Sequence, residues 1–106
     1  MSESVDGEVE PQPEVPEGGL VRILIINRRG LHASASAKFV QTVERFAAGV
    51  TVTRGGETVG GRSIMGLLTL GAAKGTTIAV VAVGDDAGAA LDAIEALLAD
   101  RFGEDE

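Results

Sequence analysis

The sequence of 106 residues contains no cysteine, no tryptophan and no tyrosine, and it has one histidine. Without cysteine there are no disulfides, no thiolate metal clusters and no cysteine nucleophile. A single histidine leaves the common zinc sites without a set of ligands, so the sequence predicts no metal and no cofactor. The three aromatic residues are all phenylalanine. The core must therefore be built from Ile, Val, Leu and Ala.

Positive charge is scarce. The chain has 9 Lys and Arg against 16 Asp and Glu, so its formal net charge is -7 at pH 7. No long basic stripe with interleaved aromatics is present, so nucleic-acid binding is not expected. No apolar run is long enough to cross a bilayer, and the N-terminus is acidic rather than basic and apolar. We therefore expect a soluble cytoplasmic protein without a membrane segment. Its basic residues are predicted to gather near the single histidine, His32, and they are Arg22, Arg28, Arg29, Lys38 and Arg62.

The two ends of the chain are polar and acidic. Residues 1–19 contain all three prolines and six carboxylates, and they cannot bury enough apolar surface to offset the entropy of ordering. We therefore predict a disordered tail over residues 1–19, one domain over residues 20–102 and a short acidic tail over residues 103–106. A role of the N-terminal tail in partner binding is the alternative.

The domain is predicted to contain seven elements in the order strand, helix, strand, strand, helix, strand, helix. The evidence is β-branched apolar runs for strands, apolar spacing of three and four for helices, and glycine or Ser63 at the breaks. The predicted strands cover residues 20–26, 50–54, 57–59 and 76–83, and the first two predicted helices cover residues 33–48 and 64–70. The last predicted helix has an apolar face from Ala87 to Leu98, with Phe102 beyond. A cap at Asp85 or Asp86 starts the last helix, and Gly49 stops the first. This order predicts an open-faced, two-layer α+β sandwich with a four-stranded antiparallel sheet and helices on one face.

The histidine lies where the first strand gives way to the first helix. A side chain at such a junction lies beside the free amides that open the helix, and these amides attract anions. Imidazole is also the side chain best suited to change charge, or to accept a group, near neutral pH. We therefore predict that His32 carries a phosphoryl group, with the amides of Ala33 and Ser34 beside the phosphate. The alternative is that His32 is only a helix cap or a surface residue.

Two motifs carry a resemblance to a known family. The first is Gly30-Leu31-His32-Ala33 followed by Ser36-Ala37-Lys38-Phe39, and the second is Ser63-Ile64-Met65-Gly66-Leu67 followed by Leu70-Gly71. At this spacing they resemble the active-site loop and the regulatory-serine motif of HPr. This family is the histidine-containing phosphocarrier of the sugar phosphotransferase system and of its nitrogen-related branch. The resemblance covers residues 20 to about 102 and implies the same open-faced sandwich.

The resemblance also implies roles for single residues. His32 would take a phosphoryl group on a ring nitrogen from phosphorylated enzyme I and pass it to an enzyme IIA-type acceptor. Ser63 would be phosphorylated by an ATP-dependent HPr kinase/phosphorylase, which dampens transfer at His32. The residues Ile64, Met65 and Leu68 would form an exposed apolar patch for partners. The chain would then be a monomeric transfer intermediate rather than a complete enzyme, and it has no glycine-rich loop for ATP.

The sequence departs from the family pattern beside the histidine. Ser34 stands where the family usually has arginine, and Ala35 stands where it often has proline. A guanidinium there would pair with the phosphate. Three interpretations remain: a nearby arginine (Arg28, Arg29 or Arg62) substitutes, Ser34 slows transfer, or this carrier is slow or regulatory by nature.

Two other functions compete with the phosphocarrier. The first is a regulatory adaptor of similar build, in which the Ile64–Leu68 surface binds a partner and His32 is never phosphorylated. The second is a hydrolase using His32 with Ser34 or Ser36, which is a poor fit because no acidic residue lies nearby in sequence to orient the ring.

Overall fold

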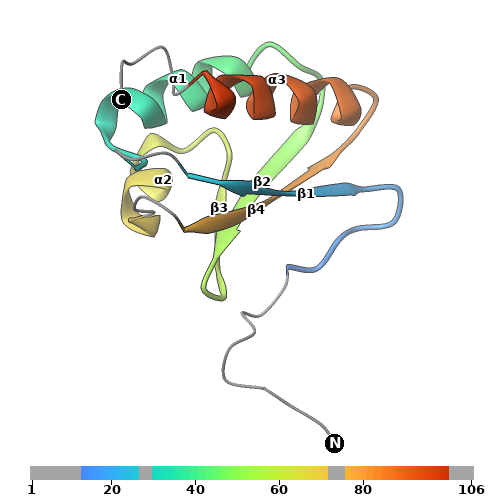
Figure 1. Cartoon of the computed structure of the whole chain (residues 1–106). Coiled ribbons are helices and arrows are strands. Elements are labelled where there is room, and N and C mark those ends of the chain that lie inside the picture. Colours follow the sequence, from blue (N-terminus) through green and yellow to red (C-terminus); the bar gives the residue numbers. More distant parts are fainter. Residues whose placement is uncertain (1–12, 27–29, 72–75, 101–106) are drawn as a thin grey trace, which may run out of the picture.

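The computed structural model describes residues 13–26, 30–71 and 76–100, and Figure 1 shows how their elements are arranged. The elements are β1 (Leu20–Ile25), α1 (Ala33–Val43), β2 (Gly49–Arg54), β3 (Glu57–Gly60), α2 (Ile64–Leu70), β4 (Thr77–Val83) and α3 (Ala87–Ala99). This is the predicted order of strands and helices. The predictions that concern residues 1–12, Arg28, Arg29, Phe102 and residues 103–106 fall outside the described residues.

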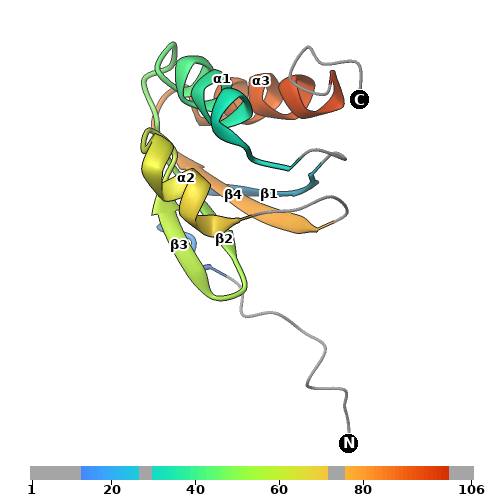
Figure 2. The ribbon, with the colours of Figure 1, turned by 90° about the vertical axis from the view of Figure 1, so that its left-hand side faces the viewer.

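The four strands form one antiparallel sheet in the order β1-β4-β2-β3. Its register places Val81 of β4 between Val21 of β1 and Thr51 of β2. The three described helices lie on the same side of this sheet, and no helix of the described residues lies against its other side (Figures 1 and 2). The predicted open-faced α+β sandwich is confirmed.

The core fills the space between the sheet and the helices. Side chains alternate across a strand, so every second residue of β4 points to the helices. These residues are Ile78, Val80 and Ala82, and all three are buried in the core. The helices contribute apolar side chains to this core, and the largest fully buried ones are Phe39, Val43, Leu67, Leu91 and Ile94. Among the described residues the buried core is aliphatic apart from Phe39, and the partly buried Phe46 packs against it.

Helix α1 is shorter than predicted, because it ends at Val43 rather than at residue 48. After Val43 the backbone forms a tighter turn, in which the amide of Phe46 donates to the carbonyl of Val43, three residues earlier, at 3.1 Å. The carbonyls of Phe46 and Ala48 accept from the Arg62 guanidinium at 3.2 and 3.1 Å. These carbonyls are therefore satisfied by a distant side chain rather than by another helical turn. Gly49, the predicted stop, is the first residue of β2.

A second tertiary contact holds the same turn. Asp86 occupies the predicted capping position of α3, but its side chain makes no hydrogen bond to that helix. Its carboxylate instead accepts from the amide of Ala47 at 2.8 Å. The carboxylate thus joins the start of α3 to the end of the α1 segment.

We expect Asp86→Ala to lower the free energy of unfolding by about 1 kcal/mol, since it removes a hydrogen bond to a charged acceptor at a partly exposed site. Urea denaturation of the purified chain measures this change. Asp85→Ala is the matched control, because Asp85 is the exposed neighbour with the same charge. Equal stabilities of the two variants would contradict a structural role for the contact with Ala47.

The helices are short. The longest of the three described helices, α3, has 13 residues. Such a helix is about 20 Å long, whereas the hydrocarbon core of a bilayer is roughly 30 Å thick. Within the described residues, no helix has both the length and the apolar composition needed to cross a membrane.

Candidate functional site

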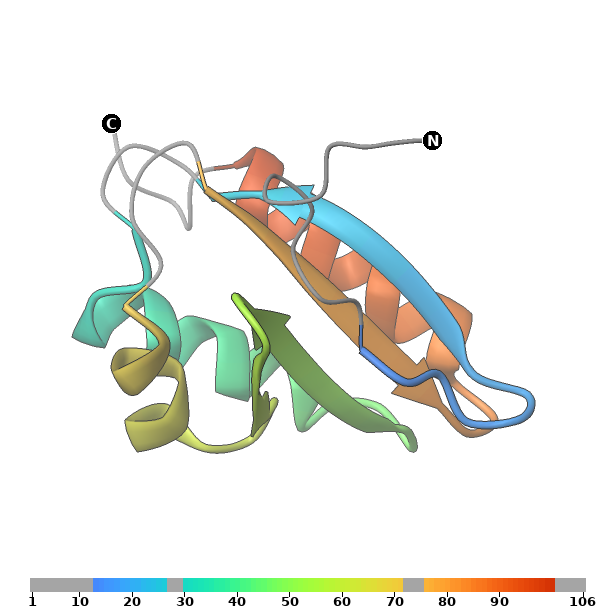
Figure 3. The same ribbon diagram turned by 90° about the horizontal axis from the view of Figure 1, so that it is seen from below.

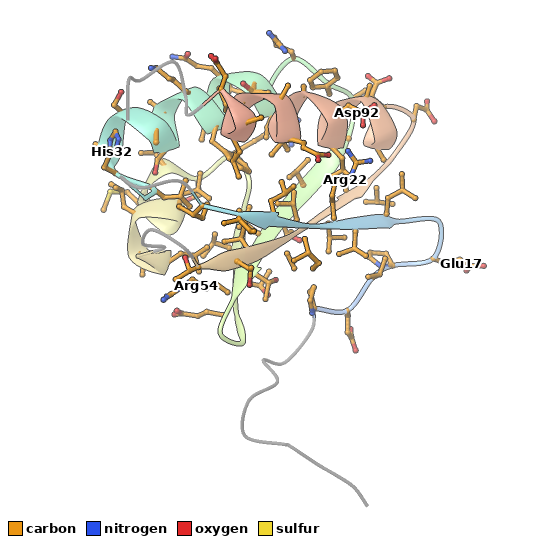
Figure 4. All side chains as sticks on the ribbon, viewed as in Figure 1. Glu17, Arg22, His32, Arg54 and Asp92 are labelled. Atoms are coloured by element: carbon orange, nitrogen blue, oxygen red, sulfur yellow. The ribbon has the colours of Figure 1, made fainter. Side chains whose placement is uncertain are left out.

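His32 lies at the N-terminal end of α1, at the edge of the molecule (Figure 4). It occupies the N-cap position with extended backbone angles (φ -75°, ψ -179°). Its side chain is half-buried, and Nδ1 accepts a hydrogen bond from the amide of Ala35 at 3.4 Å. An acceptor nitrogen carries no proton, so Nδ1 presents its lone pair to the first turn of the helix. A group attached to Nδ1 would therefore lie against the helix-opening amides.

The residues on either side of His32 fix this position. Gly30 has φ +72°, in the left-handed region that glycine adopts without strain, and it lets the chain turn into the helix. Leu31 is buried in the core and anchors the loop. The hydroxyl of Ser36 is fully buried and donates to the carbonyl of Leu31 at 3.2 Å, while the amide of Ser36 donates to the carbonyl of His32 at 2.8 Å. The imidazole is thus held between an anchored loop and the first helical turn.

The first turn of α1 begins with amides that come before the helical hydrogen bonds. Because the first i to i−4 bond runs from Ser36 to His32, the amides of Ala33 and Ser34 precede the helical ladder. These are the amides predicted from the sequence. The structure adds Ala35, whose amide bonds to the imidazole. The general rule that an N-cap side chain binds the second or third amide of the helix could have indicated Ala35, although histidine is not a usual N-cap residue.

Two of the predicted basic neighbours lie away from the histidine. Arg62 binds carbonyls that follow the C-terminal end of α1, whereas His32 caps its N-terminal end. Arg22 pairs with Asp92 and Glu95 of α3 at 2.7 and 3.0 Å, on the far side of the molecule (Figure 4). The hydrogen bond to Asp92 raises the pKa of Arg22 above its usual value.

The prediction of a basic cluster is therefore wrong for Arg22 and Arg62, because carboxylates and carbonyls elsewhere in the fold bind these side chains. Arg62 therefore does not substitute for the arginine that the family usually has at the position of Ser34. Arg28 and Arg29 fall outside the described residues. Ser34 itself is exposed on the first turn of α1, two residues after His32.

The second motif forms the start of α2. Ser63 occupies the N-cap position, and its exposed Oγ accepts from the amide of Gly66 at 2.9 Å. A Cβ at position 66 would lie 3.0 Å from both Ser63 Oγ and Val59 Cβ, so glycine permits this close approach. The helix ends at Gly71, which has φ +61°, as the sequence predicts.

Helix α2 divides its apolar residues between the core and the surface. Leu67 and Leu70 are buried, Leu68 is half-buried, and Ile64 and Met65 are 40% and 72% exposed. Folding does not require large apolar side chains on the surface, so such an exposed group indicates a contact surface. Because α2 packs against α1, the His32 end of α1 and this surface lie on the same side of the molecule (Figures 1 and 2).

Comparison with known proteins identifies the family. A family model described as "PTS HPr component phosphorylation site" matches residues 21–100, which include both motifs. The chain belongs to the HPr family. The phosphocarrier protein HPr of Neisseria meningitidis serogroup A is 49% identical over 84 residues, covering 79% of this chain and 94% of that protein. HPr of Cupriavidus necator is 46% identical over 82 residues, covering 77% of this chain and 92% of that protein.

Solved HPr structures have the same fold. The crystal structure of HPr-C-His from Thermoanaerobacter tengcongensis has a TM-score of 0.74 at 35% identity, covering 83% of this chain and 98% of that chain. The resemblance indicated by the two motifs is confirmed, and with it the family of phosphocarriers of the phosphotransferase system. The roles of His32, Ser63 and the α2 surface are taken up below as proposals.

Proposed function

We propose that the chain accepts a phosphoryl group on Nδ1 of His32 from phosphorylated enzyme I and passes it to an enzyme IIA-type acceptor. The observation that supports this most directly is the Nδ1 lone pair, directed at the first-turn amides within the matched motif. In the accepting step, Nδ1 forms a bond to phosphorus while the bond between phosphorus and the donor breaks. In the second step the same atom is the leaving group. The chain is a transfer intermediate in this proposal, not a complete enzyme.

The helix opening suits a temporary phosphate. A phosphoimidazole is a high-energy species, so a carrier must hold it without stabilising it too strongly. Backbone amides hold phosphate oxygens by geometry and dipole, and they form no covalent bond. When the phosphoryl group arrives, the amide of Ala35 exchanges its bond to Nδ1 for a bond to a phosphate oxygen. The exposed methyl group of Ala33 leaves room for the donor to approach.

In this proposal, residues at the start of α2 regulate phosphoryl transfer and form the surface to which partner proteins bind. Ser63 is exposed and is the substrate of an HPr kinase/phosphorylase. Ile64, Met65 and Leu68 form the surface that enzyme I and the acceptor bind. The carrier acts as a cytoplasmic monomer, because a protein that presents one surface to several partners must leave that surface free.

Intact mass separates this function from the adaptor. The chain is incubated with phosphoenolpyruvate and enzyme I, and its mass is followed before and after mild acid. We expect one added phosphate that is lost in acid and kept in base, as a phosphorus–nitrogen bond requires. An adaptor in which His32 is only a helix cap gains no mass, and that result would overturn the proposal.

The exposed Ser34 leads to a prediction about rate. We expect Ser34→Arg to speed phosphorylation of His32 by enzyme I by about tenfold, since a charge-assisted hydrogen bond to phosphate contributes roughly 1.5–3 kcal/mol before screening at the surface. A single-turnover assay measures the rate. Ser34→Gln is the matched control, because it adds a long polar side chain without the charge. If Ser34→Arg and the unchanged chain react at equal rates, the missing guanidinium does not limit transfer.

A further inference from the structure

The outer edge of β1 presents backbone hydrogen-bonding groups. β1 is the last strand of the sheet on the side of α3, and among the described residues only β4 pairs with it (Figure 3). The amide of Ile26 donates to the carbonyl of Thr76, the residue directly opposite it. Opposite residues of an antiparallel pair alternate between bonded and non-bonded pairs. The amides and carbonyls of Val21, Ile23 and Ile25 therefore point away from β4.

The same three residues also expose their side chains. Val21, Ile23 and Ile25 are 44%, 54% and 67% exposed. No described residue forms a backbone hydrogen bond with their outward amides and carbonyls. Native edge strands are usually protected by proline, lysine or a bulge, and β1 has none of these. An edge of this kind is a template to which another strand can be added.

The opposite edge of the sheet differs. It is formed by β3, which has only four residues and packs against α2. The amide of Gly61 donates to the carbonyl of Val50, directly opposite, so the backbone groups of Thr58 and Gly60 point outward. A short strand that contains glycine is a poor template. β1 is therefore the edge that is suited to strand addition.

Carboxylates flank the outer edge of β1. Arg22 of β1 binds Asp92 and Glu95 of α3 at 2.7 and 3.0 Å (Figure 4). The side chains of these two acidic residues are still 74% and 55% exposed, and Glu17 is exposed in the turn before β1. A strand added beside β1 would place every second side chain on the helix side, close to these carboxylates, and the others on the open side. Positive charge on the helix side of that strand would be complementary.

We propose that the outer edge of β1 binds an extended segment of a partner protein in which apolar residues alternate with lysine or arginine. The apolar side chains of the segment cover the exposed row of β1, and its cations lie beside Asp92 and Glu95. A second copy of this chain fits less well, because it brings the same carboxylates and a formal net charge of -7. Residues 1–19 also fit less well, because they contain six carboxylates and no lysine or arginine. The inference does not depend on phosphorylation of His32.

A synthetic octapeptide in which valine and lysine alternate tests this edge in the full chain. The peptide is added at low salt to ¹⁵N-labelled protein, and amide hydrogen exchange is measured by NMR. We expect exchange at Val21, Ile23 and Ile25 to slow at least about tenfold, because their outward amides become hydrogen-bonded. The amides of Thr58 and Gly60, on the opposite edge, should keep their rates. The octapeptide with glutamate in place of lysine is the matched control and should slow none of the five.

The charges are tested with two double variants. D92N with E95Q should weaken the affinity for the lysine peptide about tenfold at low salt, because it removes the carboxylates beside the added strand. E44Q with E57Q is the matched control, since it removes two carboxylates at the end of α1 and on β3. It should leave the affinity unchanged. Equal affinities of the two double variants would contradict the charge complementarity.

Ile23→Pro tests the backbone contact. The substitution removes an amide hydrogen that points outward, so the hydrogen bonds between β1 and β4 remain. It should abolish the slowing of exchange at Val21 and Ile25 by the lysine peptide.

Four results would overturn the proposal. The first is unchanged exchange on β1 with the lysine peptide, and the second is equal slowing with the glutamate peptide. The third is equal slowing on both edges of the sheet, which would show that the peptide binds any exposed strand. The fourth is slowing on β1 that follows the concentration of the chain without peptide, which would show that a second copy covers the edge.

Discussion

Replacing His32 by asparagine is expected to abolish phosphoryl uptake and to leave the fold at least as stable as before. Asparagine is among the best N-cap residues, and the bond that it would replace, from Ala35 to Nδ1, is long at 3.4 Å. The helix therefore keeps or improves its cap, by up to about 1 kcal/mol. The amide side chain has no nitrogen with a free lone pair to attack phosphorus. Transfer from enzyme I should fall below detection while the urea midpoint stays or rises.

This variant separates the two interpretations of His32. If the ring were only a cap, the wild-type chain would gain no phosphate, and His32→Asn would change only stability. Ser34→Ala is the companion control, because it alters the neighbouring exposed residue and leaves the imidazole in place. Enzyme I-dependent phosphate that persists in His32→Asn would place the acceptor atom on another residue.

Phosphorylation of Ser63 is expected to slow uptake at His32 by at least about tenfold, which corresponds to roughly 1.4 kcal/mol in the barrier. The phosphate adds almost two negative charges directly before Ile64 and Met65, which are 40% and 72% exposed. A partner that covers these apolar side chains would have to desolvate the charge. The fold itself should survive, because a negative group at the start of a helix is favourable. The rate is measured with enzyme I on chain that has been treated with the kinase.

Ser63→Ala provides the control for this prediction. It cannot be phosphorylated, and it loses the cap to the amide of Gly66, so it should be about 1 kcal/mol less stable. Its uptake rate before kinase treatment should match that of the wild type, and kinase treatment should leave the rate unchanged. If phosphorylated and unphosphorylated wild type accept phosphate equally fast, α2 is not part of the docking surface.

The elements that were predicted most accurately carry their own end signals. Helix α2 begins after Ser63 and stops at Gly71 as predicted, because its N-cap and its left-handed C-cap are both local. The break between β2 and β3 was predicted for the same reason, since it lies at two glycines, Gly55 and Gly56, and both have positive φ. The early end of α1 was not predicted, and the carbonyls that follow it are bound by a side chain, Arg62, that is distant in sequence.

At the site, too, the features set by local residues were predicted, and those set by distant contacts were not. The position of His32 at a strand-to-helix junction is readable from the change in hydrophobic period around it. The direction in which the ring points is not, because it depends on the buried Ser36 hydroxyl, the anchored Leu31 and the amide of Ala35. The positions of Arg22 and Arg62 were predicted wrongly, since the sequence does not reveal which distant carboxylates and carbonyls bind an arginine.

The measurement that tests the account most directly is a ¹⁵N and ³¹P NMR spectrum of the chain after phosphorylation by enzyme I, with the imidazole nitrogens labelled. The account predicts one phosphorus coupled to Nδ1 of His32, together with a shift of the amide of Ala35 as it moves from the ring to a phosphate oxygen. Phosphorus coupled to Nε2, or no phosphorus on the ring, would contradict it.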